Sequence, residues 1–164
     1  MAASLGLPFA FAHHFGRSEA APVLEQYRRN FRPRAGRGEP YSIVTALVVC
    51  APTDEEADFI ARSADLMFRR LFAGLPGRLP SPTEAQAHDW TSADLAFVEQ
   101  RRRGQAIGSP DTVRLALGQL LETTGADELM MTTQMFSLTD RIRSLELVSA
   151  LFTPAGAPTP QAVT

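Results

Sequence analysis

The sequence predicts an α/β protein in which four parallel β-strands alternate with helices. Three observations support this fold class. The chain has 164 residues, enough for one domain with a sizeable core. Residues 43–50 form an almost unbroken apolar run rich in β-branched side chains, which is typical of a strand buried on both faces. Strand and helix patterns alternate along the chain, and this order indicates a parallel sheet covered by helices.

The N-terminal segment begins with short elements. Residues 1–6 resemble the last turn of a helix that ends at Gly6, and Pro8–Ala12 form a short buried strand. Apolar residues recur at helical spacing over Ser18–Phe31, which predicts a helix there. The apolar stripe of this helix consists of Ala20, Leu24, Tyr27 and Phe31.

The second strand and the helix after it carry the clearest local signals. The strand covers Tyr41–Cys50. Thr53 and Glu56 form a capping box, which starts a helix that ends at Gly74. The expected core face of this helix consists of Ala57, Ile60, Ala61, Ala64, Met67, Phe68, Leu71 and Phe72.

The middle of the chain is less regular. Residues 75–90 contain three prolines and one glycine, which predicts an irregular loop that acts as a lid or a linker. A helix over Ser92–Arg103 and a short strand over Gln105–Ile107 are expected to follow this loop.

The last third of the chain repeats the strand and helix pattern. Ser109–Pro110 is a strong helix start, and Gly125 closes that helix. A strand over Asp127–Thr133 and an amphipathic helix over Ser137–Phe152 follow, and residues 153–164 are predicted to be a disordered tail. The expected core face of the first of these helices consists of Val113, Ala116, Leu117, Leu120 and Leu121.

Composition argues against several partners and compartments. The formal net charge is −2, so no bulk electrostatic attraction favours nucleic acid or an anionic membrane. No apolar run approaches the ~18 residues of a membrane span, and no Lys or Arg precedes the apolar N-terminal run as in a secretory signal. The single cysteine, Cys50, excludes an intrachain disulfide and is expected to be a small buried apolar residue in a cytoplasmic protein.

Four strands are too few to close a barrel by themselves. A (β/α)8 barrel takes eight strands and about 250 residues. The pattern alone therefore leaves two architectures open, a small open α/β sheet and half of a barrel.

Five segments, taken in order, resemble one known family. They are GLPFAFAHHF, EQYRRNFRP, EPYSIVTALVVCAPTDEEA, IGSPDTV and GADELMMTT. Together they resemble the bacterial luciferase-like flavin-dependent monooxygenases over about residues 3–152. No single segment is specific to that family, whereas their order and spacing together are.

This resemblance implies a fold, a cofactor and a reaction. Members of the family are (β/α)8 barrels that bind reduced flavin mononucleotide (FMN), or a deazaflavin in some branches, and use O2 to oxidise a small organic substrate. The matching segments correspond to the last four strands, so residues 1–152 are expected to form the C-terminal half of a TIM (β/α)8 barrel, four strands with flanking helices. The N-terminal strands and the Ser/Thr-rich turn that holds the flavin phosphate have no counterpart in this chain.

The candidate site lies where parallel strands end at their C-terminal edge. Side chains alternate along a strand, so His13 shares a face with Phe9 and Phe11, whereas His14 shares the other face with two alanines. Small residues suit a lumen that holds a flat ring, so His14 is expected toward the pocket and His13 toward the rim. His14 is the candidate catalytic residue, as a hydrogen-bonding group or a general acid or base. The candidate flavin- and substrate-binding residues are Ala12, His13, His14, Phe15, Gly108, Thr132, Thr133 and Gln134.

Structural interpretations stay open beside these functional ones. His14 and the polar residues 132–134 could simply satisfy backbone groups at strand ends. Gly108–Pro110 starts a helix whose N-terminus either attracts an anion or is plainly capped. Arg101–Arg103 suits a helix C-terminus, with a phosphate or nucleic-acid patch as the alternative. The histidine pair lacks a third ligand at regular spacing, so no metal site is expected.

Three functions follow from these alternatives. The first is a luciferase-like flavin monooxygenase, incomplete as this chain. The second is a non-catalytic half-barrel whose exposed sheet edges pair with a second copy or with the missing N-terminal half. The third is an independent open α/β domain that binds another phosphate ligand.

Overall fold

The computed structural model describes residues 1–15, 19–34, 36 and 38–152. The predicted tail, residues 153–164, lies outside this described part, as do residues 16–18 at the expected start of the first helix. The strands are β1 (Phe9–Phe11), β2 (Ser42–Cys50), β3 (Ala106–Gly108) and β4 (Glu128–Thr132). The helices are α1 (Ala20–Arg29), α2 (Asp54–Phe72), α3 (Pro82–Gln86), α4 (Ser92–Arg102), α5 (Pro110–Thr124) and α6 (Leu138–Phe152).

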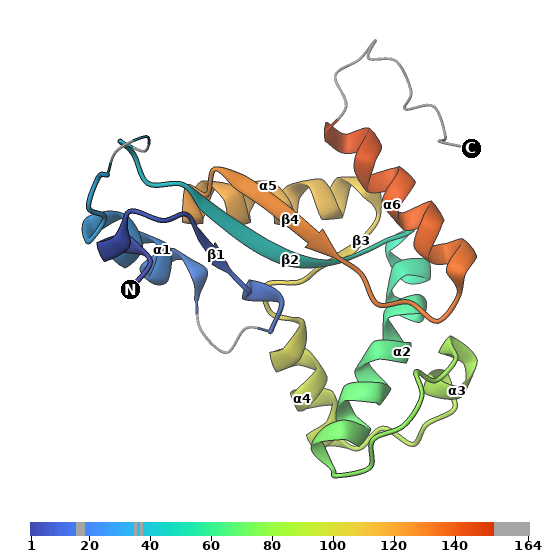
Figure 1. The fold of residues 1–164 in the computed structure, drawn as a ribbon. Coiled ribbons are helices and arrows are strands. Elements are labelled where there is room, and N and C mark those ends of the chain that lie inside the picture. The colour runs from blue at the N-terminus through green and yellow to red at the C-terminus, as the bar shows by residue number, and fades with distance from the viewer. Residues whose placement is uncertain (16–18, 35, 37, 153–164) are drawn as a thin grey trace.

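All four strands are parallel, and β2 is the centre of the sheet (Figure 1). β1 pairs with residues 42–44 of β2, and β4 pairs with residues 43–47. Because both pairings use residues 43 and 44, β1 and β4 lie on opposite edges of β2. β3 pairs with residues 48–50 only, past the point where the pairing with β4 ends. The predicted order of parallel βα units is confirmed.

One face of the sheet packs against α1, α5 and α6. Alternate residues of β2 from Val44 to Cys50 point to this side, where they meet Leu24 of α1, Leu117 of α5 and Val148 of α6. Figure 1 shows α5 running behind the sheet along β2 and β4. The predicted core face of α5 is confirmed, since Val113 and Leu117 are fully buried and its other apolar members are half-buried.

The helix α2 packs on the opposite face, near the end of β2. The predicted capping residue is confirmed, because Thr53 Oγ1 accepts a hydrogen bond from the Glu56 amide at 3.2 Å. The first turns of α2 contact Leu47 and Val49. The prediction that Leu71 and Phe72 belong to the core is wrong, because they are 49% and 60% exposed. The helix extends beyond the sheet, so its last turn has no strand to pack on, and the Phe72 ring meets the edge of the Phe97 ring.

The segment 75–90 is more regular than its prolines suggested. It contains the short helix α3, whose start is capped by Ser81: its Oγ accepts from the Glu84 amide at 3.1 Å. The sequence Ser-Pro-Thr-Glu carried this signal, since serine suits the N-cap and proline the first helical position. Trp90 packs back on α3 and donates its indole N–H to the Ala85 carbonyl at 2.9 Å.

The arginine run at the end of α4 ties that helix to α2. Asp65 is only 1% exposed, and it accepts from Arg101 Nη1 at 3.0 Å and from Arg102 Nη2 at 2.5 Å. Arg101 also lies over the Phe68 ring, 4.4 Å from its centre. A buried carboxylate needs such partners, because an unpaired buried charge is strongly destabilising. Two of the three arginines therefore have a structural role, in place of the phosphate patch considered from the sequence.

A matched pair of leucines on α5 tests this description of the core. Leu117 is 1% exposed and Leu115 is 64% exposed on the same helix. We expect Leu117→Ala to lower the free energy of unfolding by about 2–5 kcal/mol, because it removes buried methylenes and leaves a cavity. Leu115→Ala should change it by no more than about 0.5 kcal/mol. Urea denaturation followed by circular dichroism measures both, and equal effects would contradict the assignment of faces on α5.

Candidate functional site

The two faces of the sheet separate the two adjacent histidines. Phe9 and Phe11 point to the helix-packed side, where they contact the cluster around Leu24. Residues paired in register on neighbouring parallel strands point the same way. The opposite surface, here called the open face, therefore consists of Ala10, Ile43, Thr45, Leu47, Glu128, Met130 and Thr132. Figure 1 shows the β1, β2 and β4 part of the sheet from this uncovered side.

His14 lies beside the open face. It belongs to the short 3-10 turn His13–Phe15 that follows β1, and its Nδ1 lies 2.5 Å from Thr45 Oγ1. The Thr45 hydroxyl donates its single hydrogen to the Phe11 carbonyl at 3.2 Å. His14 Nδ1 is therefore assigned as the donor, which leaves Nε2 as the acceptor nitrogen of the neutral ring. Burial lowers the pKa of His14, so the ring is mainly neutral near pH 7 and can accept a proton.

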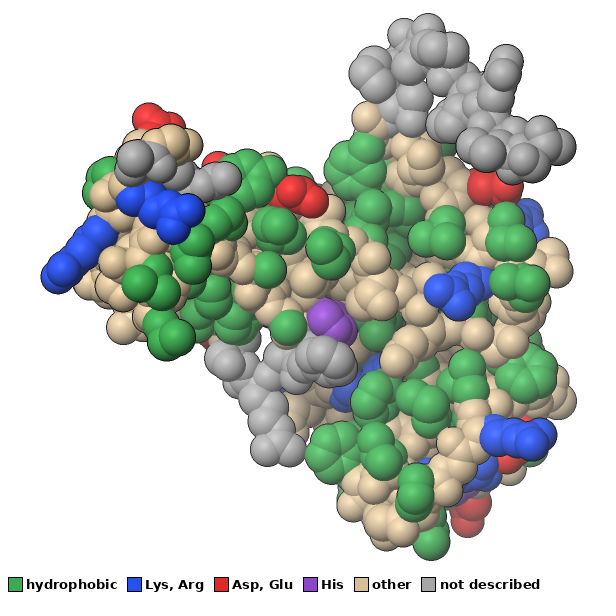
Figure 2. Space-filling view, viewed as in Figure 1, with side chains coloured by type: hydrophobic (Ala, Val, Ile, Leu, Met, Phe, Trp, Pro, Cys, Tyr) green, Lys and Arg blue, Asp and Glu red, His purple; other side chains and the backbone are tan. Residues whose placement is uncertain are grey.

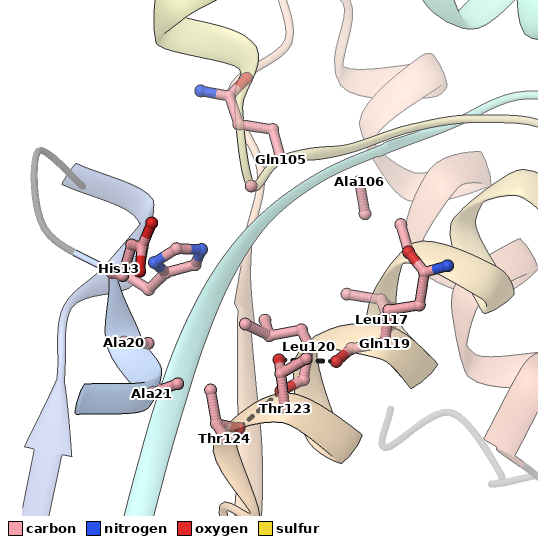
Figure 3. Close-up of a pocket in the computed structure, with 13 residues that line it drawn as sticks. His13, Ala20, Ala21, Gln105, Ala106, Leu117, Gln119, Leu120, Thr123 and Thr124 are labelled. Atoms are coloured by element: carbon pink, nitrogen blue, oxygen red, sulfur yellow. Dashed lines mark hydrogen bonds between the residues drawn. The ribbon is translucent and has the colours of Figure 1, made fainter. Parts of the chain in front are cut away.

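His13 lies on the helix-packed side. It lines a cavity of about 540 Å3 between α1 and α5 (Figure 3), together with Ala20, Ala106, Leu117, Leu120, Thr123 and Thr124. Its ring packs over Gly104, where a β-carbon would collide with the imidazole. Its Nδ1 is buried and has no hydrogen-bond partner among the described residues. Burial, and next the nearby His14, lower the pKa of His13. The two rings thus lie on opposite sides of the sheet, and His13, which was expected at the rim, lines this cavity, whereas His14 is not among the lining residues.

The N-terminus of α5 is occupied by a side chain of α2. The Ser109 amide donates to Asp54 Oδ1 at 2.6 Å, while Ser109 Oγ donates to Thr112 Oγ1 at 3.2 Å. This amide hydrogen bond is the main reason that the pKa of Asp54 is lowered. Ser109 thus occupies the N-cap position, but its side chain accepts no capping hydrogen bond. Its own amide is instead bound by the carboxylate of Asp54. An anion at Gly108–Ser109 would have to replace a carboxylate.

The polar residues after β4 have unused hydrogen-bonding capacity. Thr132 ends the strand on the open face. Thr133 Oγ1 and Gln134 Oε1 are both buried and find no hydrogen-bond partner among the described residues. Buried polar atoms normally have partners, so these two atoms fit a bound water or a ligand with hydrogen-bond donors. The next residue, Met135, packs beside Leu47 and fixes this segment against the sheet.

The remaining sequence candidates have simpler surroundings. Ala12 is exposed between β1 and the turn, and Phe15 is the last residue of that turn. Cys50 is 2% exposed, and burial raises the pKa of its thiol. The prediction that Cys50 is a small buried residue of the core is confirmed. Sequence reasoning missed Thr45 and Asp54. The signal for Thr45 was a single hydroxyl inside an otherwise apolar strand, whereas the contact of Asp54 spans 55 residues and leaves no local pattern.

Two features are absent from the described residues, a metal-binding cluster and a membrane-spanning helix. No three His, Cys, Asp or Glu side chains in this part of the chain are grouped as they would be around a metal ion. Over the same residues, no helix combines the length and apolar character needed to cross a membrane.

These observations define the class of protein: a parallel α/β sheet with flanking helices, in which polar residues follow the C-terminal ends of the strands. No protein-family model matches the chain. Curated relatives do: a luciferase-like monooxygenase of Escherichia coli (strain K12) is 35% identical over 147 residues, 90% of this chain and 44% of that protein. The uncharacterized protein YvbT of Bacillus subtilis (strain 168) is 36% identical over 149 residues, 91% of this chain and 44% of that protein.

Solved structures agree with these relatives. The crystal structure of apo-MsnO8 matches with a TM-score of 0.84 and 33% identity, over 92% of this chain and 46% of that chain. The oxygenating constituent of 3,6-diketocamphane monooxygenase from the CAM plasmid of Pseudomonas putida matches with a TM-score of 0.56 and 21% identity, over 90% of this chain and 42% of that chain, which shows the fold alone. Along nearly its whole length the chain is similar to a luciferase-like monooxygenase, and it spans about half the length of the curated relatives it matches.

Two glycines test the contact between Asp54 and α5. Gly108 has φ +155, and a β-carbon there would lie 2.6 Å from Asp54 Oδ1 and from Thr112 Cγ2, whereas Gly118 inside α5 has nothing within 4 Å. We expect Gly108→Ala to lower the free energy of unfolding by about 1–3 kcal/mol through backbone strain and displacement of Asp54. Gly118→Ala should raise it by about 0.5–1 kcal/mol, because alanine favours a helix interior. Urea denaturation of both variants decides the matter, and a neutral Gly108→Ala would show that this contact is absent.

The histidine pair predicts a pH dependence of stability near neutrality. A histidine whose pKa is lower in the folded state binds its proton more readily in the unfolded chain, where the pKa is about 6.5. Its contribution is complete above pH ~6.5 and is lost as the pH falls from there through the folded-state pKa. We expect the urea midpoint to fall between pH 7.5 and 5.5, and His13→Gln to reduce that fall. His88→Gln, on the loop after α3, is the control, and an unchanged slope in His13→Gln would refute the assignment.

Proposed function

We propose that this chain provides the wall of a flavin site in a luciferase-like monooxygenase that uses O2 to oxidise a small organic substrate. The observation that carries the proposal is the His14–Thr45 hydrogen bond beside the open face, in a chain related along nearly its whole length to a luciferase-like monooxygenase. Active sites of parallel barrels lie at this C-terminal edge of the strands.

FMN is the cofactor that we propose. The 3,6-diketocamphane monooxygenase of similar fold was crystallised in complex with FMN. The residues present fit such a group: the open face is lined by Ala10, Ile43 and Met130, which suit a flat ring, and the buried oxygens of Thr133 and Gln134 still need donors. The isoalloxazine ring of a flavin carries an N–H group, which could donate a hydrogen bond to one of these oxygens. The flavin, when bound and reduced, would supply the electrons that activate O2.

The residues of this chain would bind, orient and shield. Thr45 fixes the His14 ring by accepting from Nδ1, so that Nε2 accepts a hydrogen bond or a proton from the cofactor or the substrate. Thr132 and Gln134 would contact the ring edge, and Met130, 51% exposed, would cover its face. Gly108 is a weaker contact in this proposal, because Asp54 already occupies the adjacent Ser109 amide.

One observation favours a second candidate function. The curated relatives are more than twice as long as the part this chain matches, so the flavin site proposed here has only one wall. The second candidate function is therefore that of a non-catalytic half-barrel, which pairs with another half-barrel.

Titration of FMN into the purified chain, followed by quenching of flavin fluorescence, tests the proposed function. We expect saturable quenching, weakened about three- to tenfold in His14→Gln because one hydrogen bond is lost. His88→Gln, which removes a histidine far from the open face in sequence, should bind as the unchanged chain does. No quenching by the chain, either alone or with a partner half-barrel bound, would refute the flavin site.

A further inference from the structure

We propose that Asp65 is a positioning residue for the histidine pair. Through Arg101 and Arg102 it holds the turn that follows α4, and the His13 ring rests on that turn. The consequence for chemistry rests on the proposed function, because His14, the residue proposed to face the flavin, is the next residue of the same short 3-10 turn.

The support of the His13 ring is a glycine. Gly104 has φ +79, and a β-carbon there would collide with Nε2 of His13 and lie 2.9 Å from its Cε1. Glycine alone combines this backbone conformation with room for the ring. The Nδ1 atom of His13 has no hydrogen-bond partner in the described part of the chain, and the ring centre lies 6.4 Å from that of Phe11. The position of the ring therefore depends on packing against Gly104 and Phe11.

Hydrogen bonds tie the turn that carries Gly104 to the end of α4. The Gln105 amide donates to the Arg102 carbonyl at 3.0 Å. The Gln105 side chain donates from Nε2 to the Arg101 carbonyl at 3.0 Å, and its Oε1 accepts from Arg101 Nη1 at 3.2 Å. A movement of these two arginines would therefore be carried to Gly104.

Asp65 of α2 fixes both arginines. Its Oδ1 accepts from Arg101 Nη1 at 3.0 Å, and its Oδ2 accepts from Arg102 Nε at 2.9 Å and Nη2 at 2.5 Å. These hydrogen bonds join charged groups around a carboxylate that is almost fully buried, where such bonds are strong. Asp58 also accepts from Arg102, at 2.5 Å, but its side chain is 41% exposed, so water weakens this second contact.

The helix α4 is held by charged contacts more than by apolar ones. Among its residues only Asp94 is buried, and its carboxylate pairs with Arg69 of α2 near the start of the helix. Figure 1 shows α4 leading from the far end of α2 to the sheet. In Figure 2 a histidine reaches the surface between the sheet and the α2–α4 part of the molecule, with arginine side chains below it. Without Asp65, no buried apolar side chain of α4 would keep Gly104 in place.

The two histidines are coupled through their backbone. They are consecutive residues of one short turn, so a displaced His13 ring would alter the backbone from which His14 reaches Thr45. The hydrogen bond to Thr45 is what directs Nε2 of His14 in the proposed function. Asp65, buried between α2 and α4, would thus act on the proposed flavin site through two packed elements.

The NMR signals of the histidine Cε1–H groups, followed through a pH titration of the purified chain, test the positioning role. The chain has three histidines, and a His→Gln variant of each assigns its signal. We expect Asp65→Asn to shift the signals of His13 and His14. The pKa of His13, which burial lowers, should rise by about half a unit or more toward 6.5, because the loosened ring gains water.

Two controls separate positioning from general loosening. Glu99→Gln removes a carboxylate from the same helix, where it pairs with Arg103 at the surface, and it should leave all three signals unchanged. His88, which packs against the Trp90 ring, is the internal reference. A shift of His88 as large as that of His13 in Asp65→Asn would overturn the positioning role, and so would a folded Asp65→Asn with unchanged His13 and His14 signals.

A milder variant keeps the proposal testable if circular dichroism shows that Asp65→Asn does not fold. Arg102→Lys retains the positive charge but loses the paired hydrogen bonds from Nε and Nη2 to Asp65. It should shift His13 and His14 and spare His88. Unchanged His13 and His14 signals in this variant would overturn the proposal.

Titration with FMN distinguishes this proposal from the proposed function. We expect Asp65→Asn to weaken FMN binding, but by no more than His14→Gln does. Shifted His13 and His14 signals in a chain that does not quench FMN would support the positioning role and count against the flavin site. FMN quenching with unshifted histidines would keep the flavin site and refute the positioning role.

Discussion

The hydrogen bonds of β2 hold the sheet together, because each of the other three described strands pairs with it. β1 and β4 share its first half on opposite edges, and β3 pairs with its last three residues. Residues 44 and 46–51 are almost fully buried, which no other element of the chain achieves over a comparable length among the described residues. An almost unbroken apolar run is the composition that such a position requires, since α1, α5 and α6 pack on one side of the strand and α2 on the other.

The divergence of the two histidines follows from this strand as well. Phe9 and Phe11 are drawn to the cluster around Leu24 and Val44, so the chain leaves β1 with a fixed orientation. His13 then falls over Gly104 on the helix side, and His14 falls beside Thr45 on the other. Thr45 is the polar interruption of β2 that makes this possible. A β-branched apolar residue there would fill the same space but could not orient the His14 ring.

Sequence patterns predicted what short-range physics determines. The run 43–50, the capping residue Thr53 and the left-handed Gly125 each act within a few residues, and each was found where expected. Contacts between distant segments were not predictable in this way. The acceptor for the Ser109 amide comes from Asp54, and the partner of Arg101 comes from Asp65. The exposure of Leu71 and Phe72 is likewise a long-range matter, because helical spacing cannot show where the neighbouring sheet ends.

The two ends of the sheet differ in how completely their polar groups are paired. At the end where β2 begins, Asp127 accepts from the amide and hydroxyl of Ser42, and Tyr27 donates to the Leu7 and Tyr41 carbonyls. The buried side-chain atoms that lack a partner in the described chain lie elsewhere. Two of them belong to α2 and to the arginine cluster, and the other three are His13 Nδ1, Thr133 Oγ1 and Gln134 Oε1.

Those three atoms all follow the C-terminal ends of β1 and β4. Unpaired buried polar atoms are costly for folding alone, so their concentration at one end of the sheet requires another reason. A ligand or a second wall that supplies hydrogen-bond partners is such a reason. Folding therefore satisfies the end where the strands begin and leaves the end where they finish incomplete, which is the end where parallel α/β proteins carry out their chemistry.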